Sequence, residues 1–176
     1  MPNTLSDFWR LILEMKSEMI ISLNDINLDD ETCCKFWPTA EDPEIHLEDS
    51  IVLVFKRRIR FTQYDIYSLN IIYKQVIHIY IYLPFSCDEF FSFWQDADSL
   101  SRNSRNIIVT CFDGATASGV FVALSSVIER MRIEKQCDIC TAVRMVRHNR
   151  KQFVGDQSDL LLLYGAALIY NMKYFS

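Results

Sequence analysis

The sequence predicts an α/β or α+β fold, in which a mixed central sheet is covered by helices. Residues 51–82 are rich in Ile, Val and Tyr, which favour strands, and the last third carries apolar residues at helical spacing. Strands followed by helices are the order expected of a sheet with helices packed on it. Half of the 176 residues are apolar and 13% are aromatic, which is enough for a hydrophobic core in one domain or a large piece of one.

The chain opens with a predicted helix over residues 8–20. Its apolar residues recur every three or four positions, and Ser6 or Asp7 can cap its start. We expect a short buried strand over 20–23. The polar and acidic residues 24–31 then predict a loop.

The middle of the chain predicts the sheet. A second acidic loop over 41–49 precedes an apolar strand over 51–55. Residues 57–67 mix charges with strand formers, and residues 70–82 fit one longer strand, which Pro84 ends.

Residues 89–170 predict the helices that cover the sheet. We expect a helix over 89–100 with a broad aromatic face, a polar linker over 99–106 and a compact buried strand over 107–109. Three helices follow: one begins near Ser118, one is capped by Asp138, and one spans residues 159–170 after a break at 155–158.

Charge and composition exclude several classes of protein. Lys plus Arg is 18 and Asp plus Glu is 23, so the net charge of −5 argues against a general nucleic-acid binder. No stretch approaches the ~20 apolar residues of a membrane span, and the N-terminus has no signal-peptide pattern. The six cysteines form no spaced disulfide framework, which indicates a reduced, cytosolic compartment. Cys137 and Cys140 have no partner pair for zinc, so we expect no metal and no cofactor.

The most informative stretch is IIVTCFDGATASG, residues 107–119. A strand leads into Cys111, a loop with Gly114 follows, and a helix begins near Ser118. Backbone N–H groups of such loops and of helix N-termini bind phosphate and favour a reactive thiolate. The alternative is that Cys111 is an ordinary buried small residue at a strand end.

This stretch resembles the signature of the protein tyrosine phosphatases, His-Cys-x-x-Gly-x-x-Arg-Ser/Thr-Gly. Cys111, Gly114, Ser118 and Gly119 fall on it in register. Further matches follow in the order of the family: DFWR at 7–10, CKFWP at 34–38, and the helices at 120–134, 137–150 and 153–170. The likeness is greatest to the second, membrane-distal domain of receptor-type phosphatases.

The resemblance implies the tyrosine-phosphatase fold, a mixed central sheet flanked by helices, with the N-terminal part of the domain missing. Residues 1–176 would be a partial phosphatase domain with a degenerate acid loop at 83–85. Apolar surface that the missing part covers in the family would then need a partner. The phosphate-loop residues that the resemblance implies are Thr110, Cys111, Phe112, Asp113, Gly114, Ala115, Thr116, Ala117, Ser118 and Gly119.

The departures from the family all concern chemistry. Ala117 stands where the family has the Arg that binds two phosphate oxygens, and Phe85 stands where it has the Asp that protonates the leaving group. Asp159 aligns with the Gln that positions the hydrolytic water, and Thr110 replaces the His before the nucleophile. Asp113 places a negative charge inside the loop.

These departures predict a pseudophosphatase in which Cys111 is a vestigial nucleophile. Such a domain would act as a protein-interaction or regulatory module in phosphotyrosine signalling, with a phosphatase domain or another signalling protein as partner. It would be cytoplasmic, in the tail of a membrane receptor if the product is longer. The alternatives are an active phosphatase that forms a phosphocysteine on Cys111, and a redox sensor built on the same thiol.

One further cluster is basic and follows helical spacing. Its two interpretations are a solvated helix face and a docking surface for an acidic or phosphorylated partner. Its members are Arg144, Arg147, His148, Arg150 and Lys151.

Overall fold

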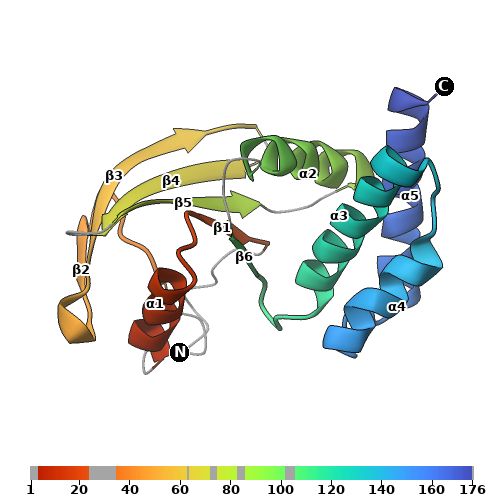
Figure 1. Ribbon diagram of the computed structural model, residues 1–176. Coiled ribbons are helices and arrows are strands. Elements are labelled where there is room, and N and C mark those ends of the chain that lie inside the picture. Colours follow the sequence, from red (N-terminus) through yellow and green to blue (C-terminus); the bar gives the residue numbers. More distant parts are fainter. Residues whose placement is uncertain are drawn as a thin grey trace. The chain divides into compact units, whose positions relative to one another are not determined.

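The computed structural model describes residues 4–23, 35–62, 64–71, 75–82, 86–101 and 106–175 (Figure 1). The chain divides into two compact units. The first combines residues 1–83 with 99–109 and contains the sheet. The second combines residues 84–98 with 110–176 and is built from helices.

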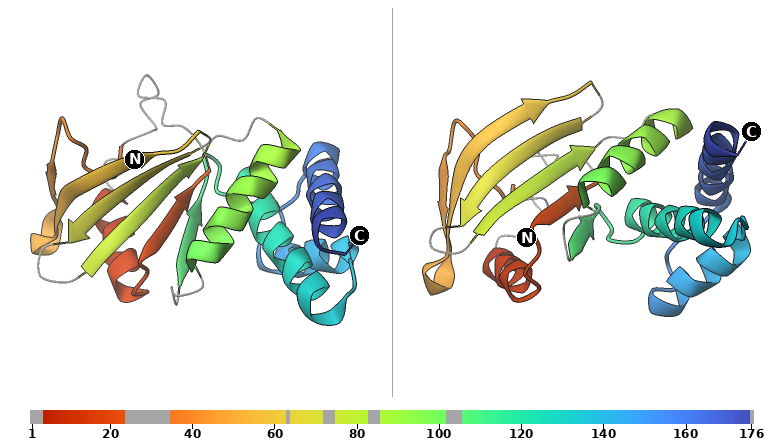
Figure 2. Two further views of the ribbon diagram at one scale, coloured as in Figure 1. Left: turned by 90° about the horizontal axis from the view of Figure 1, so that it is seen from above. Right: turned by 45° about the horizontal axis from the view of Figure 1, so that its top comes forward.

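The first unit is organised around one mixed sheet. Its strand order within the described residues is β2-β3-β4-β5-β1-β6 (Figure 2). Strands β2 to β5 pair antiparallel, whereas β1 pairs parallel with β5. The strands are β1 (Met19–Ser22), β2 (Glu44–His46), β3 (Val52–Arg60), β4 (Tyr64–Ile71), β5 (Gln75–Tyr82) and β6 (Ile107–Thr110).

Helix α1 (Leu5–Glu14) covers one face of this sheet. Its Trp9 and Ile12 are fully buried in a cluster with alternate residues of the strands, including Leu69 and Ile79. Alternation of this kind puts every second side chain of a strand on the same face. The indole Nε1 of Trp9 also donates to the carbonyl of Phe36 at 2.8 Å. The apolar face of α1 packs on the apolar face of the sheet, and the indole N–H of Trp9 has a hydrogen-bond acceptor. Together these contacts hold α1 on the sheet.

The second unit is held together by aromatic packing between its helices. Phe90, Phe91 and Trp94 on α2 are buried, which confirms the predicted aromatic face of this helix. The Trp94 Nε1 donates to the Ser125 hydroxyl at 2.8 Å, and Arg132 forms an ion pair at 2.8 Å with Asp98. The helices are α2 (Cys87–Ser101), α3 (Thr116–Glu134), α4 (Ile139–Asn149) and α5 (Gln157–Tyr174).

The α/β class with a mixed sheet is confirmed, but several element bounds are wrong. The predicted helix over 8–20 ends at Glu14, because Lys16 adopts φ 52° and Met19 already belongs to β1. Neither Ser6 nor Asp7 caps α1. The N-cap is Thr4, and the Asp7 carboxylate pairs with Arg10 at 3.0 Å.

Three strand predictions and one loop prediction are also wrong. Residues 57–67 are divided between the end of β3 at Arg60 and the start of β4 at Tyr64. Residues 70–82 do not form one strand: β4 ends at Ile71 and β5 begins at Gln75, and these two residues pair across an antiparallel hairpin. The acidic loop over 41–49 contains β2 and the start of a short 3-10 turn, η2 (Glu48–Ser50). The β6 strand is exposed or half-buried rather than buried, because it lies at the edge of the sheet. The predicted loop over 24–31 lies outside the described residues.

The histidine of β5 makes stability depend on pH. His78 lies opposite Ser68 on β4, with Nδ1 3.0 Å from the Ser68 hydroxyl. Burial, and then the charge of Arg57, lower the pKa of His78, against a smaller opposing effect of Glu18. In mild acid, His78 of the unfolded chain therefore binds a proton that His78 of the folded chain does not bind. We expect the free energy of unfolding to fall as the pH drops below about 6.5.

Urea unfolding at about pH 7.5 and pH 5.5 tests this expectation. The denaturation midpoint should be lower at the acidic pH, and His78→Gln should remove part of that difference. An identical pH dependence in His78→Gln would contradict the assignment to this side chain.

Candidate functional site

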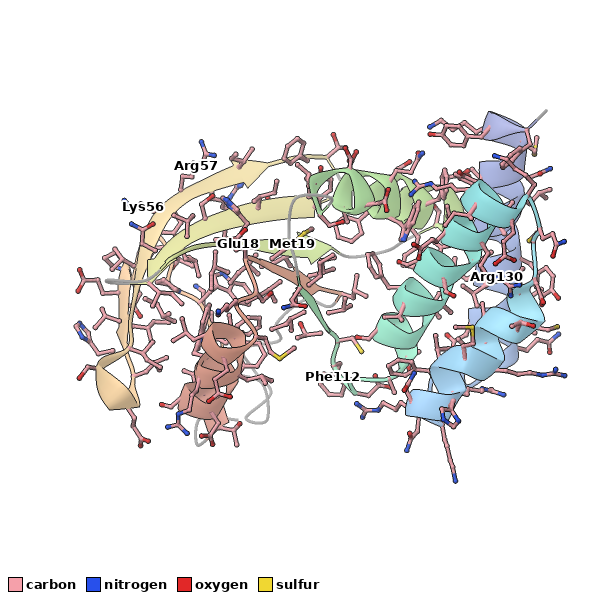
Figure 3. All side chains as sticks on the ribbon, in the orientation of Figure 1. Glu18, Met19, Lys56, Arg57, Phe112 and Arg130 are labelled. Atoms are coloured by element: carbon pink, nitrogen blue, oxygen red, sulfur yellow. The ribbon has the colours of Figure 1, made fainter. Side chains whose placement is uncertain are left out.

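The loop between β6 and α3 carries the residues of the phosphatase-like signature, and Figure 3 shows it with Phe112 labelled. Thr110 ends β6 and Cys111 follows it. Helix α3 begins at Thr116, earlier than the predicted start near Ser118. The chain turns at Gly114, whose φ of 65° favours glycine and whose N–H donates to the Cys111 carbonyl at 3.2 Å. Phe112 is 70% exposed and points out of the loop.

Asp113 directs its carboxylate onto the start of α3. Its Oδ1 accepts the backbone N–H groups of Ala115 at 2.8 Å and Thr116 at 2.9 Å, and its Oδ2 accepts the Thr116 hydroxyl. Free N–H groups at a helix N-terminus are the donors that such a loop offers to an anion. A carboxylate of the chain itself therefore occupies two of the donors of this loop.

These hydrogen bonds also fix the charge of Asp113. The Thr116 hydroxyl, followed by the two backbone N–H groups, holds the pKa of this carboxyl far below its usual range. The thiol of Cys111 adds a further contact, with Sγ donating to Oδ1 at 3.3 Å. Cys111 thus faces a fixed negative charge.

No Lys or Arg occurs within residues 110–119. Ala117 lies half-buried in the first turn of α3 and offers only a methyl group. The neighbouring Ser118 is buried, and its Oγ has no hydrogen-bond partner among the described residues. The signature positions therefore supply neutral or negative side chains, and no positive one.

A cation that the signature did not point to reaches the loop from the end of α4. The Arg150 guanidinium donates to the Asp113 carbonyl at 3.5 Å and lies beside Gly114. Its contact is with the backbone of the loop. The sequence placed Arg150 only in a basic cluster, and no spacing rule connects it to residues 37 positions away.

Asp159 lies in the first turn of α5. Its N–H donates to the Asp156 carboxylate at 2.9 Å, and its own Oδ2 accepts the Gly155 N–H at 2.9 Å. Asp156 is thus the N-cap of α5, and Asp159 bonds back to Gly155, the residue before that cap. Burial raises the pKa of Asp159, and the charges of Asp156 and Asp113 raise it further. The hydrogen bond from the Gly155 N–H opposes this rise in pKa, because it favours the charged carboxylate.

The segment before α5 is hydrogen-bonded to α4 and packs closely against α3. Arg147 donates to the carbonyls of Phe153 at 3.0 Å and Val154 at 2.6 Å. This pair of bonds holds Val154 at φ 53°, a strained conformation for a β-branched residue. Gly119 makes the close approach possible, because a Cβ there would lie 2.9 Å from Phe153.

Phe85 and the acid loop at 83–85 lie outside the described residues. Within the described ranges, no group of three His, Cys, Asp or Glu side chains is arranged to hold a metal ion. No described helix combines the length and the apolar character required to cross a membrane.

Gly119 provides a direct test of the close approach of Phe153 to α3. We expect Gly119→Ala to lower the free energy of unfolding by about 1–3 kcal/mol, because the added methyl overlaps Phe153. Gly155→Ala is the matched control, since its Cβ would meet only the Gln152 carbonyl at 3.3 Å. Denaturant unfolding compares the two variants. Equal losses would contradict the close approach.

Asp113 provides a second test, with a defined pH dependence. We expect Asp113→Ala to lower stability at about pH 6 by about 1 kcal/mol, as for other lost helix caps. The folded pKa lies below the ordinary value of 3.8, so this contribution is complete above that pH and is lost as the pH falls through the folded pKa. Asp113→Asn keeps an oxygen acceptor and should lose less. A wild-type advantage that does not shrink in acid would contradict the capping role.

Comparison with known proteins identifies the same family as the signature residues. The family model "Protein-tyrosine phosphatase" matches residues 1–169. "Tyrosine-protein phosphatase Lar-like" of Caenorhabditis elegans is 25% identical over 185 residues, which cover 98% of this chain and 8% of that protein. "Receptor-type tyrosine-protein phosphatase C" of Homo sapiens is 24% identical over 194 residues, which cover 96% of this chain and 14% of the relative.

A third relative, "Receptor-type tyrosine-protein phosphatase epsilon" of Homo sapiens, is 25% identical over 196 residues. The match covers 96% of this chain and 26% of that protein, so the chain spans about a quarter or less of the length of these relatives. The predicted resemblance is confirmed, including the likeness to receptor-type members. With almost all of its length matched by the family model, the chain belongs to the protein-tyrosine phosphatase family.

Proposed function

We propose that this chain is a catalytically impaired tyrosine-phosphatase domain, a pseudophosphatase, that serves as a cytoplasmic protein-interaction or regulatory module in phosphotyrosine signalling. In this proposal residues 1–176 are part of a phosphatase domain, with the vestigial phosphate loop at 110–119. The observation that carries it is the Asp113 carboxylate on the N–H groups of Ala115 and Thr116, where a phosphate oxygen would need those donors.

The lost arginine supports the same proposal. A guanidinium binds two phosphate oxygens with a planar fork that no other side chain reproduces. Ala117 offers no donor at the aligned position, and Arg150 is directed to a backbone carbonyl of the loop. Removal of a single preorganised donor from an anionic transition state typically costs about 10²–10³ in rate, and the arginine supplies two.

Electrostatics add to this loss. A phosphate dianion over Cys111 would lie next to the ionised Asp113, whose Oδ1 is already 3.3 Å from the sulfur. Like charges at such separations repel, and the exposure of Asp113 to solvent weakens this repulsion without removing it. The nucleophile is therefore retained without the binding site that would present a phosphorus atom to it.

The aligned positions for proton transfer are altered as well. Phe85 has no proton to donate, and general-acid catalysis is worth about 10²–10⁴ in rate. The Asp159 carboxylate is committed to the Gly155 N–H in the segment before α5, instead of orienting a water. Fold-determining contacts are meanwhile intact in both units. A preserved scaffold beside a dismantled site favours a role in binding.

The decisive assay is turnover of a small aryl phosphate and of a phosphotyrosine peptide. We expect the purified wild type to release phosphate no faster than Cys111→Ser.

Retention of Cys111 favours the rival function, an active phosphatase that works through a phosphocysteine. Turnover by the wild type that disappears in Cys111→Ser would establish that rival.

A restored variant tests which changes matter. We expect the triple variant Asp113→Ala, Ala117→Arg and Phe85→Asp to gain phosphate release that depends on Cys111. Thermal melts must show that the variant is folded. A folded variant with intact Cys111 and no gain would mean that the site is impaired for another reason than the one proposed.

A further inference from the structure

The outer edge of β3 is open beyond its pairing with β2 (Figure 2). The short strand β2 pairs with residues 52–54, and the Pro43 carbonyl accepts the Phe55 N–H at 2.8 Å. Strand β3 continues to Arg60, and no described residue forms a backbone hydrogen bond to residues 56–60 on the side away from β4. Residues 56–60 are therefore a free strand edge in the part of the chain that the structure describes.

The hairpin between β3 and β4 fixes which backbone groups face this edge. The Phe61 N–H donates to the Tyr64 carbonyl at 2.9 Å, and the pairing with β4 stays in register along residues 57–60. In an antiparallel pair, the backbone groups of successive residues alternate between the partner strand and the opposite side. The N–H and C=O groups of Arg58 and Arg60 are therefore directed away from β4.

A free edge of this kind can accept a further strand. The backbone hydrogen bonds of an added strand supply affinity, whereas the side chains that lie beside those of the edge select the sequence that binds. The outward groups of Arg58 and Arg60 are spaced as they are in a regular ladder. The side chains of residues 56–60 then determine which strand fits.

The side chains of this edge are basic. The run KRRIR over residues 56–60 holds four cations, all of them exposed, in a chain whose net charge is −5. No Asp or Glu occurs within residues 51–64. Figure 3 shows Lys56 and Arg57 extending away from the sheet. The free edge thus lies in a locally positive part of an acidic protein.

Three of the four cations have no acidic partner among the described residues. Arg58 forms an ion pair with Asp65 on β4. Arg57 donates to a neutral hydroxyl at 3.5 Å, and neither Lys56 nor Arg60 forms an ion pair within the described ranges. The positive charge of the edge is therefore available to a partner.

This charge decides between the possible occupants of the edge. Two copies of β3 paired edge to edge would bring KRRIR beside KRRIR, so that cations would lie next to cations. The same charges thus protect the edge from a second copy of the chain. Carboxylates of an incoming strand would instead lie beside opposite charges.

We propose that residues 56–60 of β3 bind an extended acidic segment of a partner protein as an added strand. The backbone of that segment pairs with the outward groups of Arg58 and Arg60, and its carboxylates lie beside the unpaired cations of the edge. The inference rests on the proposed role as an interaction module and names the chemistry of the partner. The charges steer the approach and add a dependence on salt.

The first test uses a fluorescein-labelled peptide in which glutamate alternates with valine, and measures binding by fluorescence anisotropy. We expect saturable binding that weakens with added salt, and a loss of about tenfold or more in Arg60→Glu. Lys151→Glu is the matched control, because it makes the same change of charge at an exposed position outside β3. It should bind like the wild type.

The second test measures amide hydrogen exchange of the wild type by NMR and does not depend on the folding of a variant. Binding of the peptide should slow exchange at the N–H groups of Arg58 and Arg60, which face the open edge. The Ile59 N–H is the internal control, because it faces β4 and should change little. A peptide of the same sequence with N-methyl groups on alternate residues has the same charge but cannot pair, and should bind at least about tenfold more weakly.

Four results would overturn the proposal. These are equal binding by Arg60→Glu and the wild type, equal binding of the N-methylated peptide, unchanged exchange at Arg58 and Arg60 in the complex, and binding to vesicles of anionic lipid but not to the peptide. Slow exchange at both amides in the free protein that is lost on dilution would assign the edge to a second copy instead.

The turnover assay separates the two proposals. Phosphate release by the wild type would remove the pseudophosphatase role whatever the peptide does. Loss of peptide binding alone removes only the docking edge of β3.

Discussion

The chemistry of this domain depends on one short-range interaction, the Asp113 carboxylate on the N–H groups of Ala115 and Thr116. A helix start leaves backbone donors without partners, and either a bound anion or a side chain must satisfy them. Asp113 is charged and lies three residues before Thr116 in the chain. It therefore loses little conformational entropy on binding these donors, and it competes effectively with a free anion. The same contact therefore stabilises α3 and removes donors that phosphate binding requires.

The rest of the domain tolerates this exchange, because most of its packing lies outside the loop. In the first unit, α1 is held on the sheet by Trp9 and its apolar neighbours. In the second, Phe91 and Trp94 pack among the helices, and Arg147 clamps the segment before α5. Under the proposed function, the catalytic site is lost while the surfaces of the helices persist and remain available for binding.

The sequence predicted elements whose signal is local. The aromatic face of α2 and the Asp138 cap of α4 are read from residues within one or two turns of helix. The break between β4 and β5 was missed, because Ile, Val and Tyr on both sides of the hairpin give one continuous strand pattern. The signature placed Asp113 in the loop, but its rotamer and the approach of Arg150 are tertiary facts that no spacing rule supplies. Asp159 was likewise predicted by alignment, while its bond to Gly155 emerged only from the structure.

The central claim is that the chain's own carboxylate excludes an oxyanion from the loop. Calorimetric titration with tungstate, a phosphate analogue, measures this directly and does not require turnover. We predict no binding by the wild type, and measurable binding when Asp113→Ala is combined with Ala117→Arg, because donors and a fork then become available. Tungstate bound by the wild type, and seated over the Cys111 sulfur in a soaked crystal, would contradict the claim.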